Sequence, residues 1–125
     1  MYSIKGTGEI ILPRGDTLLF KVRLKGGEFP EDTVGVFGIC NARGTRTLFA
    51  KEFPVRENGV TVFLSNRDTR ELSAGTYAWD LRIVTDPERD EDGNVKCDDA
   101  TDNVISLFSG AGMPSFTVTE VAVDV

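Results

Sequence analysis

A run of acidic residues between positions 86 and 102, DPERDEDGNVKCDDATD, is the stretch best suited to hold a metal ion. Calcium loops place oxygen ligands at positions 1, 3, 5 and 12 around a glycine at position 6. With Gly93 as that glycine, the ligand positions fall on Glu88, Asp90, Asp92 and Asp99. The first is Glu where the pattern has Asp, and the last is an Asp, which reaches less far than Glu. We therefore expect a solvated hairpin tip turning at Asp92 and Gly93. The alternative is a weak calcium site with Asp90, Asp92 and Asp99 as ligands.

The chain contains no histidine, which removes the commonest general base and the commonest metal ligand. Ser-His-Asp and Cys-His nucleophilic machinery is excluded, and so in practice are zinc sites built from histidine and cysteine. Sugar hydrolysis by paired carboxylates needs a cleft and one acid kept protonated by burial. The acids here fall on outward strand positions or in the acidic stretch. We therefore expect no catalytic residue and predict that the protein is not an enzyme.

A second short motif, Arg14-Gly15-Asp16, is the tripeptide that animal integrins read in adhesion ligands. It follows Pro13, so the four residues also suit a turn between two antiparallel strands. Proline ends one strand, glycine takes the unusual dihedral and aspartate bonds neighbouring amides. We expect the turn, because an integrin ligand must project its arginine and aspartate from an exposed tip.

The net charge of −6 is concentrated in the acidic stretch, which holds eight acids and two bases and leaves the remainder neutral. No basic face is available for phosphate backbones, so nucleic-acid binding is not expected. The apolar runs are too short to span a membrane, and no basic region precedes an apolar core at the N-terminus. We expect a protein that is cytoplasmic when synthesised and has no contact with membranes.

The two cysteines, Cys40 and Cys97, are too few for a disulfide framework, and their spacing fits no metal knuckle. We expect Cys40 to be a buried small hydrophobe and Cys97 to be a loop thiol, with a bridge between them as the less favoured alternative.

The elements that must position these residues are strands, because apolar residues recur with period two rather than 3.6. The 125 residues suit a single domain spanning 1–125, with 86–102 as an acidic loop insertion. We expect a hairpin between TVGVFGICNA and TRTLFAKEF. The glycines of the first segment suggest a bulge or close packing. A further strand, NGVTVFLS, should start at the turn pair Asn58-Gly59. RDTRELSAG allows one helical turn at most. We expect two sheets with seven or eight strands in total. The core between them should comprise Leu18, Phe20, Val22, Val62, Leu64, Tyr77, Trp79, Leu81 and Phe116.

The stretch LSAGTYAWDLRIV, residues 72–84, resembles the corner that precedes the sixth strand of immunoglobulin-like domains. In that corner a tyrosine hydroxyl bonds back to the turn before it, and the residue two positions later points into the core. Tyr77 and Trp79 occupy those positions here. The fold class that this implies is an immunoglobulin-like, two-sheet antiparallel β-sandwich.

Together with RGDTLLFKVRL, GVTVFLSNRDTRELSAGTYAWDLRIV and FTVTEVAV, the chain is similar to immunoglobulin-like domains of phage and prophage tail and baseplate proteins, in particular the N-terminal domain of baseplate upper proteins. The resemblance covers about two thirds of the chain. It implies a non-enzymatic structural role in a virion, acting through protein–protein contacts. The long acidic stretch departs from the short hairpin usual at that place, so any contact made there would be particular to this protein.

Partners are expected to be other proteins of a particle or further copies of this chain. Leu19, Phe63 and Val84 fall on outward strand positions and could form a patch for such a partner. SGAGMPS, residues 109–115, is placed to interrupt the last strand. The alternative function is a surface module that binds carbohydrate or protein with a calcium-organised acidic loop.

Overall fold

The computed structural model describes residues 2–25, 28–97, 103–108 and 112–120. Within these residues no helix is both long and apolar enough to cross a bilayer. The elements in chain order are β1 (Ser3–Ile4), β2 (Ile10–Pro13), β3 (Leu18–Arg23), β4 (Val34–Asn41), β5 (Thr47–Arg56), β6 (Gly59–Leu64), α1 (Asn66–Arg70), β7 (Gly75–Val84), β8 (Val104–Ser106) and β9 (Ser115–Thr119). The protein is therefore all-β, as expected, with one short helix.

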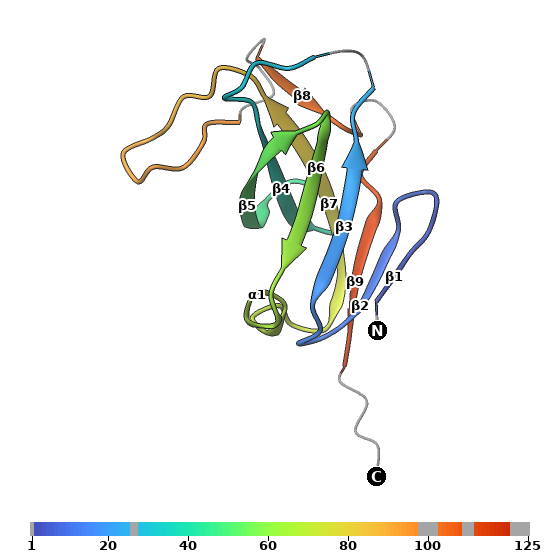
Figure 1. Cartoon of the computed structure of the whole chain (residues 1–125). Helices are drawn as coiled ribbons and strands as arrows, with labels where there is room; N and C mark the ends of the chain where they lie inside the picture. The colour runs from blue at the N-terminus through green and yellow to red at the C-terminus, as the bar shows by residue number, and fades with distance from the viewer. Residues whose placement is uncertain (1, 26–27, 98–102, 109–111, 121–125) are drawn as a thin grey trace.

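The strands of the described residues form one hydrogen-bonded sheet in the order β1-β2-β9-β7-β4-β5-β6-β3, with β8 beside β7. The sheet curls so that β3 and β6 face the strands around β4 and β7 (Figure 1). β5 makes the connection, because it pairs with β4 as far as Pro54 and then with β6 through Val55 and Arg56. The layers expected as two sheets are thus parts of one curled sheet.

The predicted hairpin of the central strands is confirmed. β4 pairs antiparallel with β5 on one side and with β7 on the other. Both suggestions made for its glycines hold for this strand: the register shifts between Ile39 and Cys40, and Gly35 lies against Val60, whose methyls are 3.0 and 3.1 Å from where a Cβ would be. A side chain at position 35 would push the facing strand away.

The turn between β5 and β6 lies one residue earlier than the sequence predicts. Glu57 and Asn58 take the positive φ angles, 53° and 58°, that a tight hairpin turn requires. Gly59 is already the first residue of β6 and pairs with Arg56. The inward alternation of Val60, Val62 and Leu64 is confirmed, since all three are fully buried.

The core lies inside the curl and contains most of the residues expected there. Leu18, Val62, Leu64, Trp79, Leu81 and Phe116 are buried. Phe20, Val22 and Tyr77 are partly buried and pack against this cluster. The core also includes the fully buried Phe37, Ile39, Ile10 and Leu12, which come from β4 and β2.

The corner before β7 has the geometry that the sequence predicts. The Tyr77 hydroxyl donates to the Ser73 carbonyl at 2.7 Å. Trp79, two residues later, is 3% exposed and donates from Nε1 to the Gly8 carbonyl at 2.8 Å. The tryptophan therefore ties the β1–β2 hairpin to the middle of β7.

β8 and β9 lie one after the other along β7, so the last strand is interrupted as expected. β8 pairs with 82–84 and β9 with 75–78. Bonding to β7 extends to Leu107, whose amide donates to the Leu81 carbonyl, and to Pro114, whose carbonyl accepts from the Trp79 amide. Residues 109–111 and 121–125 of the predicted last segments lie outside the described part of the chain.

Candidate functional site

The acidic stretch forms an arm, here called the acidic arm and defined as residues 86–97, which ends in a tight hairpin (Figure 1). Arg89 and Val95 form an isolated antiparallel bridge. Beyond it, the Asp90 amide donates to the Asn94 carbonyl at 2.9 Å, and the Gly93 amide donates to the Asp90 carbonyl at 3.0 Å. Gly93 has a φ of 85°, which glycine adopts readily. The predicted hairpin tip is confirmed.

The Asp90 carboxylate shapes this tip from within. Its Oδ1 accepts hydrogen bonds from the amides of Asp92 at 2.9 Å and Asn94 at 3.0 Å. This is the local bonding by which aspartate stabilises turns. Oδ1 is therefore shared between two backbone donors of the tip.

An open hollow of about 450 Å³ lies at the tip, lined by Arg89, Asp90, Glu91, Asp92 and Lys96. Three acids face it together with two bases, so its negative charge is partly balanced. The third predicted ligand, Asp99, lies outside the described residues. Within the described residues no group of three or more aspartate, glutamate or cysteine side chains is placed to hold a metal ion. Calcium binding at Asp90, Asp92 and Asp99 stays a prediction.

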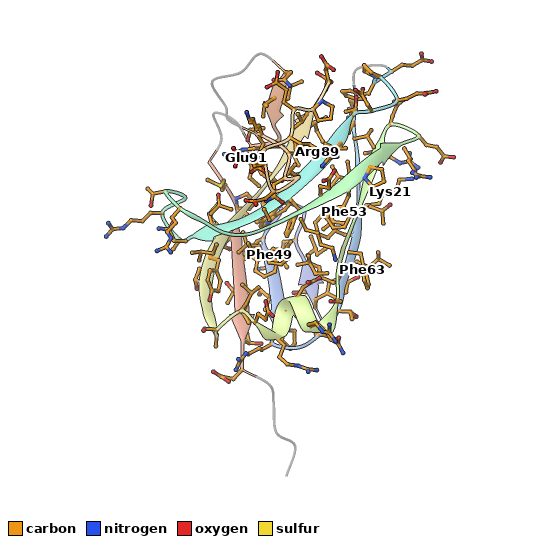
Figure 2. All side chains as sticks on the ribbon, turned by 90° about the vertical axis from the view of Figure 1, so that its left-hand side faces the viewer. Lys21, Phe49, Phe53, Phe63, Arg89 and Glu91 are labelled. Atoms are coloured by element: carbon orange, nitrogen blue, oxygen red, sulfur yellow. The ribbon has the colours of Figure 1, made fainter. Side chains whose placement is uncertain are left out.

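Arg89 anchors the arm to the sheet. Its guanidinium makes two parallel bonds to Glu52 on β5, with Nη1–Oε1 of 2.6 Å and Nη2–Oε2 of 3.0 Å. The hydrogen bonds from Arg89 lower the pKa of the Glu52 carboxyl, against a smaller opposing effect of burial. Figure 2 shows Arg89 and Glu91 in the upper part of this side of the molecule.

A second anchor lies nearer the end of the arm. Arg82 on β7 donates from Nη1 to the Cys97 carbonyl at 3.0 Å. Glu52, Val36 and Arg82 form one cross-strand row, because Val36 pairs with both of the others. The two anchors are the ends of this row, so the arm crosses the outer face of β5, β4 and β7.

This crossing accounts for the burial of the outer face beneath the arm. Val36, Cys40 and Asp80 on that face are 8%, 6% and 6% exposed. Asp80 accepts hydrogen bonds from the Ser106 hydroxyl and the Leu81 amide, which compensate for its burial. The expectation that the acids on strands face outward to solvent is therefore wrong for Asp80.

Cys40 and Cys97 are both free thiols. Cys40 is buried and Cys97 is half-buried on the arm, as predicted. Both line a small cavity of about 30 Å³ between the arm and the sheet, together with Asp80 and Arg82. The cavity is about the size of one water molecule and is too small for an organic ligand.

Arg14-Gly15-Asp16 forms the expected turn. The Asp16 amide donates to the Pro13 carbonyl at 3.0 Å, and Gly15 has a φ of 85°. The Arg14 Nε donates to the Arg70 carbonyl at 3.1 Å, and the Thr69 hydroxyl donates to the Asp16 carbonyl at 2.6 Å. The turn joins β2 to β3, which do not pair with each other, so it is a corner of the curl rather than a hairpin. Its arginine and main chain are held against α1, which does not suit an adhesion loop.

Two of the three predicted patch residues lie on the surface. Leu19 and Phe63 are directly opposite each other on β3 and β6, and they are 52% and 43% exposed. Lys51 lies 5.7 Å from the centre of the Phe63 ring and also forms an ion pair with Asp68 at 3.0 Å. Val84 is fully buried, so its inclusion in the patch is wrong.

The sequence did not indicate the anchors Glu52, Arg82 and Arg89, nor the exposed Ile105 and Leu107 beside β7. The anchors join residues far apart in the sequence, and no local pattern indicates them. The only available signal was that Arg89 and Lys96 are the two bases of an otherwise acidic stretch. Comparison of the chain with protein-family models, with curated proteins and with solved structures found no match.

Proposed function

We propose that this protein is a non-enzymatic structural or assembly protein that works by binding other proteins, of the kind found in phage or prophage tails and baseplates. The observation that carries the protein-binding part is the exposed pair Leu19 and Phe63, which are direct cross-strand neighbours. Apolar side chains that gather on an outer sheet face mark a site of protein contact when they form a patch. The phage or prophage assignment depends on the resemblance of the sequence segments described above.

An immunoglobulin-like arrangement of the curled sheet belongs to the same proposal. It is supported by the Tyr77 hydrogen bond to the corner and by the inward Trp79. It is also supported by the packing of β3 and β6 over β4 and β7. Such scaffolds carry their contacts on loops and sheet faces, while the core supplies rigidity.

The proposal is tested first on the genes that flank this one. If neighbouring genes encode tail-tube, baseplate or other virion proteins, each product is co-expressed with this protein and the complex is isolated. Neighbours that encode export, cell-wall or sugar-metabolism proteins, and no binding to any virion protein, would overturn the assembly role. They would favour the surface module with a calcium-organised arm, for which calcium in the millimolar range should raise the melting temperature.

The contact surface is tested with a double variant, Leu19→Asp with Phe63→Asp. We expect it to weaken the complex about tenfold or more, as loss of a central apolar contact does. Leu48→Asp is the matched control, because Leu48 is a similarly exposed apolar residue, at 45%, on β5. Equal binding by the double variant and the control would show that the partner docks elsewhere.

A further inference from the structure

An open groove of about 350 Å³ lies between the end of β3 and β8, here called the β3–β8 groove. Its apolar lining comes from four segments of the chain and consists of Leu24, Phe29, Ile83, Ile105 and Leu107. Arg23 and Lys25 also line it and are its two charged residues. The volume is within the range of sites that bind peptide side chains or small molecules.

The exposed apolar residues of the groove point to the inner side of the sheet. Ile105 is directly opposite Ile83, and the Leu107 amide donates to the Leu81 carbonyl. Opposed residues in an antiparallel pair have their side chains on the same face, and here Ile83 and Leu81 face the core. Ile105 and Leu107 are nevertheless 57% and 39% exposed. They are core-facing residues that no described strand covers.

β8 also presents an unpaired backbone edge to the groove. The hydrogen bonds of Leu107 to Leu81, and of Thr85 to Asn103, show that odd-numbered residues of this segment bond to β7. Because antiparallel pairs alternate, the amides and carbonyls of Val104 and Ser106 point away from β7. No strand of the described residues pairs with that side of β8.

β3 is the end strand of the sheet, and no strand in the described ranges pairs with its other side. The Leu24 amide donates to the Asn58 carbonyl, so even-numbered residues of β3 bond to β6. The amides and carbonyls of Lys21 and Arg23 therefore point to the open side. On that same side the Tyr2 hydroxyl donates to the Leu19 carbonyl at 2.6 Å. This hydrogen bond lies at the end of β3 that is farther from the groove.

We propose that the β3–β8 groove binds an extended segment of a partner protein, which adds to β8 as a further strand. The backbone edge supplies the hydrogen bonds, and apolar side chains at every second position of the segment cover Ile105 and Leu107. This inference rests on the proposed function, because it names the kind of partner that an assembly protein would bind at this place.

The positive charge at the groove favours acidic residues at the positions of the segment that are not apolar. Arg23 and Lys25 are two cations in a protein of net charge −6, and within the described residues neither has an ion-pair partner. Acidic side chains at the alternate positions of the segment would lie toward them. The segment is therefore one that alternates apolar and acidic residues, and like charge would disfavour a basic one.

The test uses a fluorescein-labelled ten-residue peptide that alternates valine and glutamate, and a second peptide that alternates valine and lysine. Fluorescence anisotropy measures their binding to the whole chain. We expect the glutamate peptide to bind at least about tenfold more tightly than the lysine peptide. Ile105→Lys should weaken its binding by about tenfold or more, and the control Leu48→Lys should leave it unchanged.

A second measurement separates strand addition from simple apolar contact. Amide hydrogen exchange followed by NMR should slow at Val104 and Ser106 when the glutamate peptide binds. If Ile105→Lys does not fold, Arg23→Glu combined with Lys25→Glu replaces it, and this variant should reverse the preference between the two peptides. These positions are at the surface end of β3, so the fold should survive the change.

Three results would overturn the inference: no binding of the glutamate peptide below about 1 mM, equal binding of both peptides, or unchanged exchange at Val104 and Ser106. Self-association of the chain that Ile105→Lys abolishes, without peptide binding, would show that a second copy occupies the groove instead. If a partner complex depends on Leu19 and Phe63 but neither peptide binds, the proposed function stands and only the groove inference is wrong. If the glutamate peptide binds but no virion protein does, the groove inference stands and the assembly role is wrong.

Discussion

Replacing Trp79 with alanine tests how the interior of the curled sheet is held together. The indole ring is 3% exposed and packs against the rings of Phe20, Phe37 and Phe108, with centroid distances of 5.6, 5.5 and 4.9 Å. Its Nε1–H donates to the Gly8 carbonyl. Aromatic-to-alanine changes in a core cost roughly 3–5 kcal/mol, and leaving the Gly8 carbonyl without its donor adds about 1 kcal/mol. We expect Trp79→Ala to lower the free energy of unfolding by about 4–6 kcal/mol, a large part of the stability of many domains.

The assay is urea unfolding followed by far-ultraviolet circular dichroism, because Trp79 is the only tryptophan and its fluorescence is lost in the variant. Trp79→Phe keeps an aromatic ring but removes the donor, and it should cost about 1–3 kcal/mol. Leu19→Ala is the control and should change the stability by less than about 0.5 kcal/mol, as surface changes do. A loss under about 1 kcal/mol for Trp79→Ala would refute the packing described here.

Three further predictions concern the cap of α1, the acidic arm and the thiols. Ser65→Ala removes the hydrogen-bond acceptor of the capping box that starts α1 and should cost about 1 kcal/mol in urea unfolding. Arg89 lowers the pKa of Glu52, so their contact stabilises the folded state above the unfolded pKa of about 4.3 and is lost as the pH falls through the lower folded value. Protection of the arm amides from exchange, measured relative to the intrinsic rate at each pH, should therefore fall below about pH 4, and in Glu52→Gln it should already be low at neutral pH. A maleimide should modify the half-buried Cys97 faster than the buried Cys40 in the native protein, and both at similar rates in urea.

The strands that face solvent on one side could be predicted from the sequence with their inward residues. In β6 the alternation of Val60, Val62 and Leu64 with Thr61 and Phe63 matches the observed burial, because one face of that strand meets the core and the other meets water. A period-two pattern of apolar residues reflects a difference in burial between the two faces of a strand. It predicts the inward residues reliably where one face is buried and the other is in water.

β7 shows where that reasoning ends. Its outward residues Asp80 and Val84 are buried. Asp80 lies on the face that the arm crosses, and the arm is anchored there by the Arg89–Glu52 pair and the Arg82 bond to Cys97. Such contacts are set by tertiary packing between segments distant in sequence. The hairpin tip of the arm could be predicted because its bonds are local, whereas the place of the arm on the sheet could not.

β8 connects the two surfaces of greatest interest. Its Ser106 hydroxyl bonds to Asp80 on the outer face beneath the arm, while its Ile105 side chain lies in the groove on the inner face. Successive residues of a strand point to opposite faces. The three residues of β8 that pair with β7 therefore contribute side chains to both faces of the sheet. With so few ladder bonds, β8 is held largely by what packs on each side. The hydrogen bond between Ser106 and Asp80, on the face that the arm crosses, therefore helps to hold the strand whose open edge and exposed isoleucine form the groove proposed above.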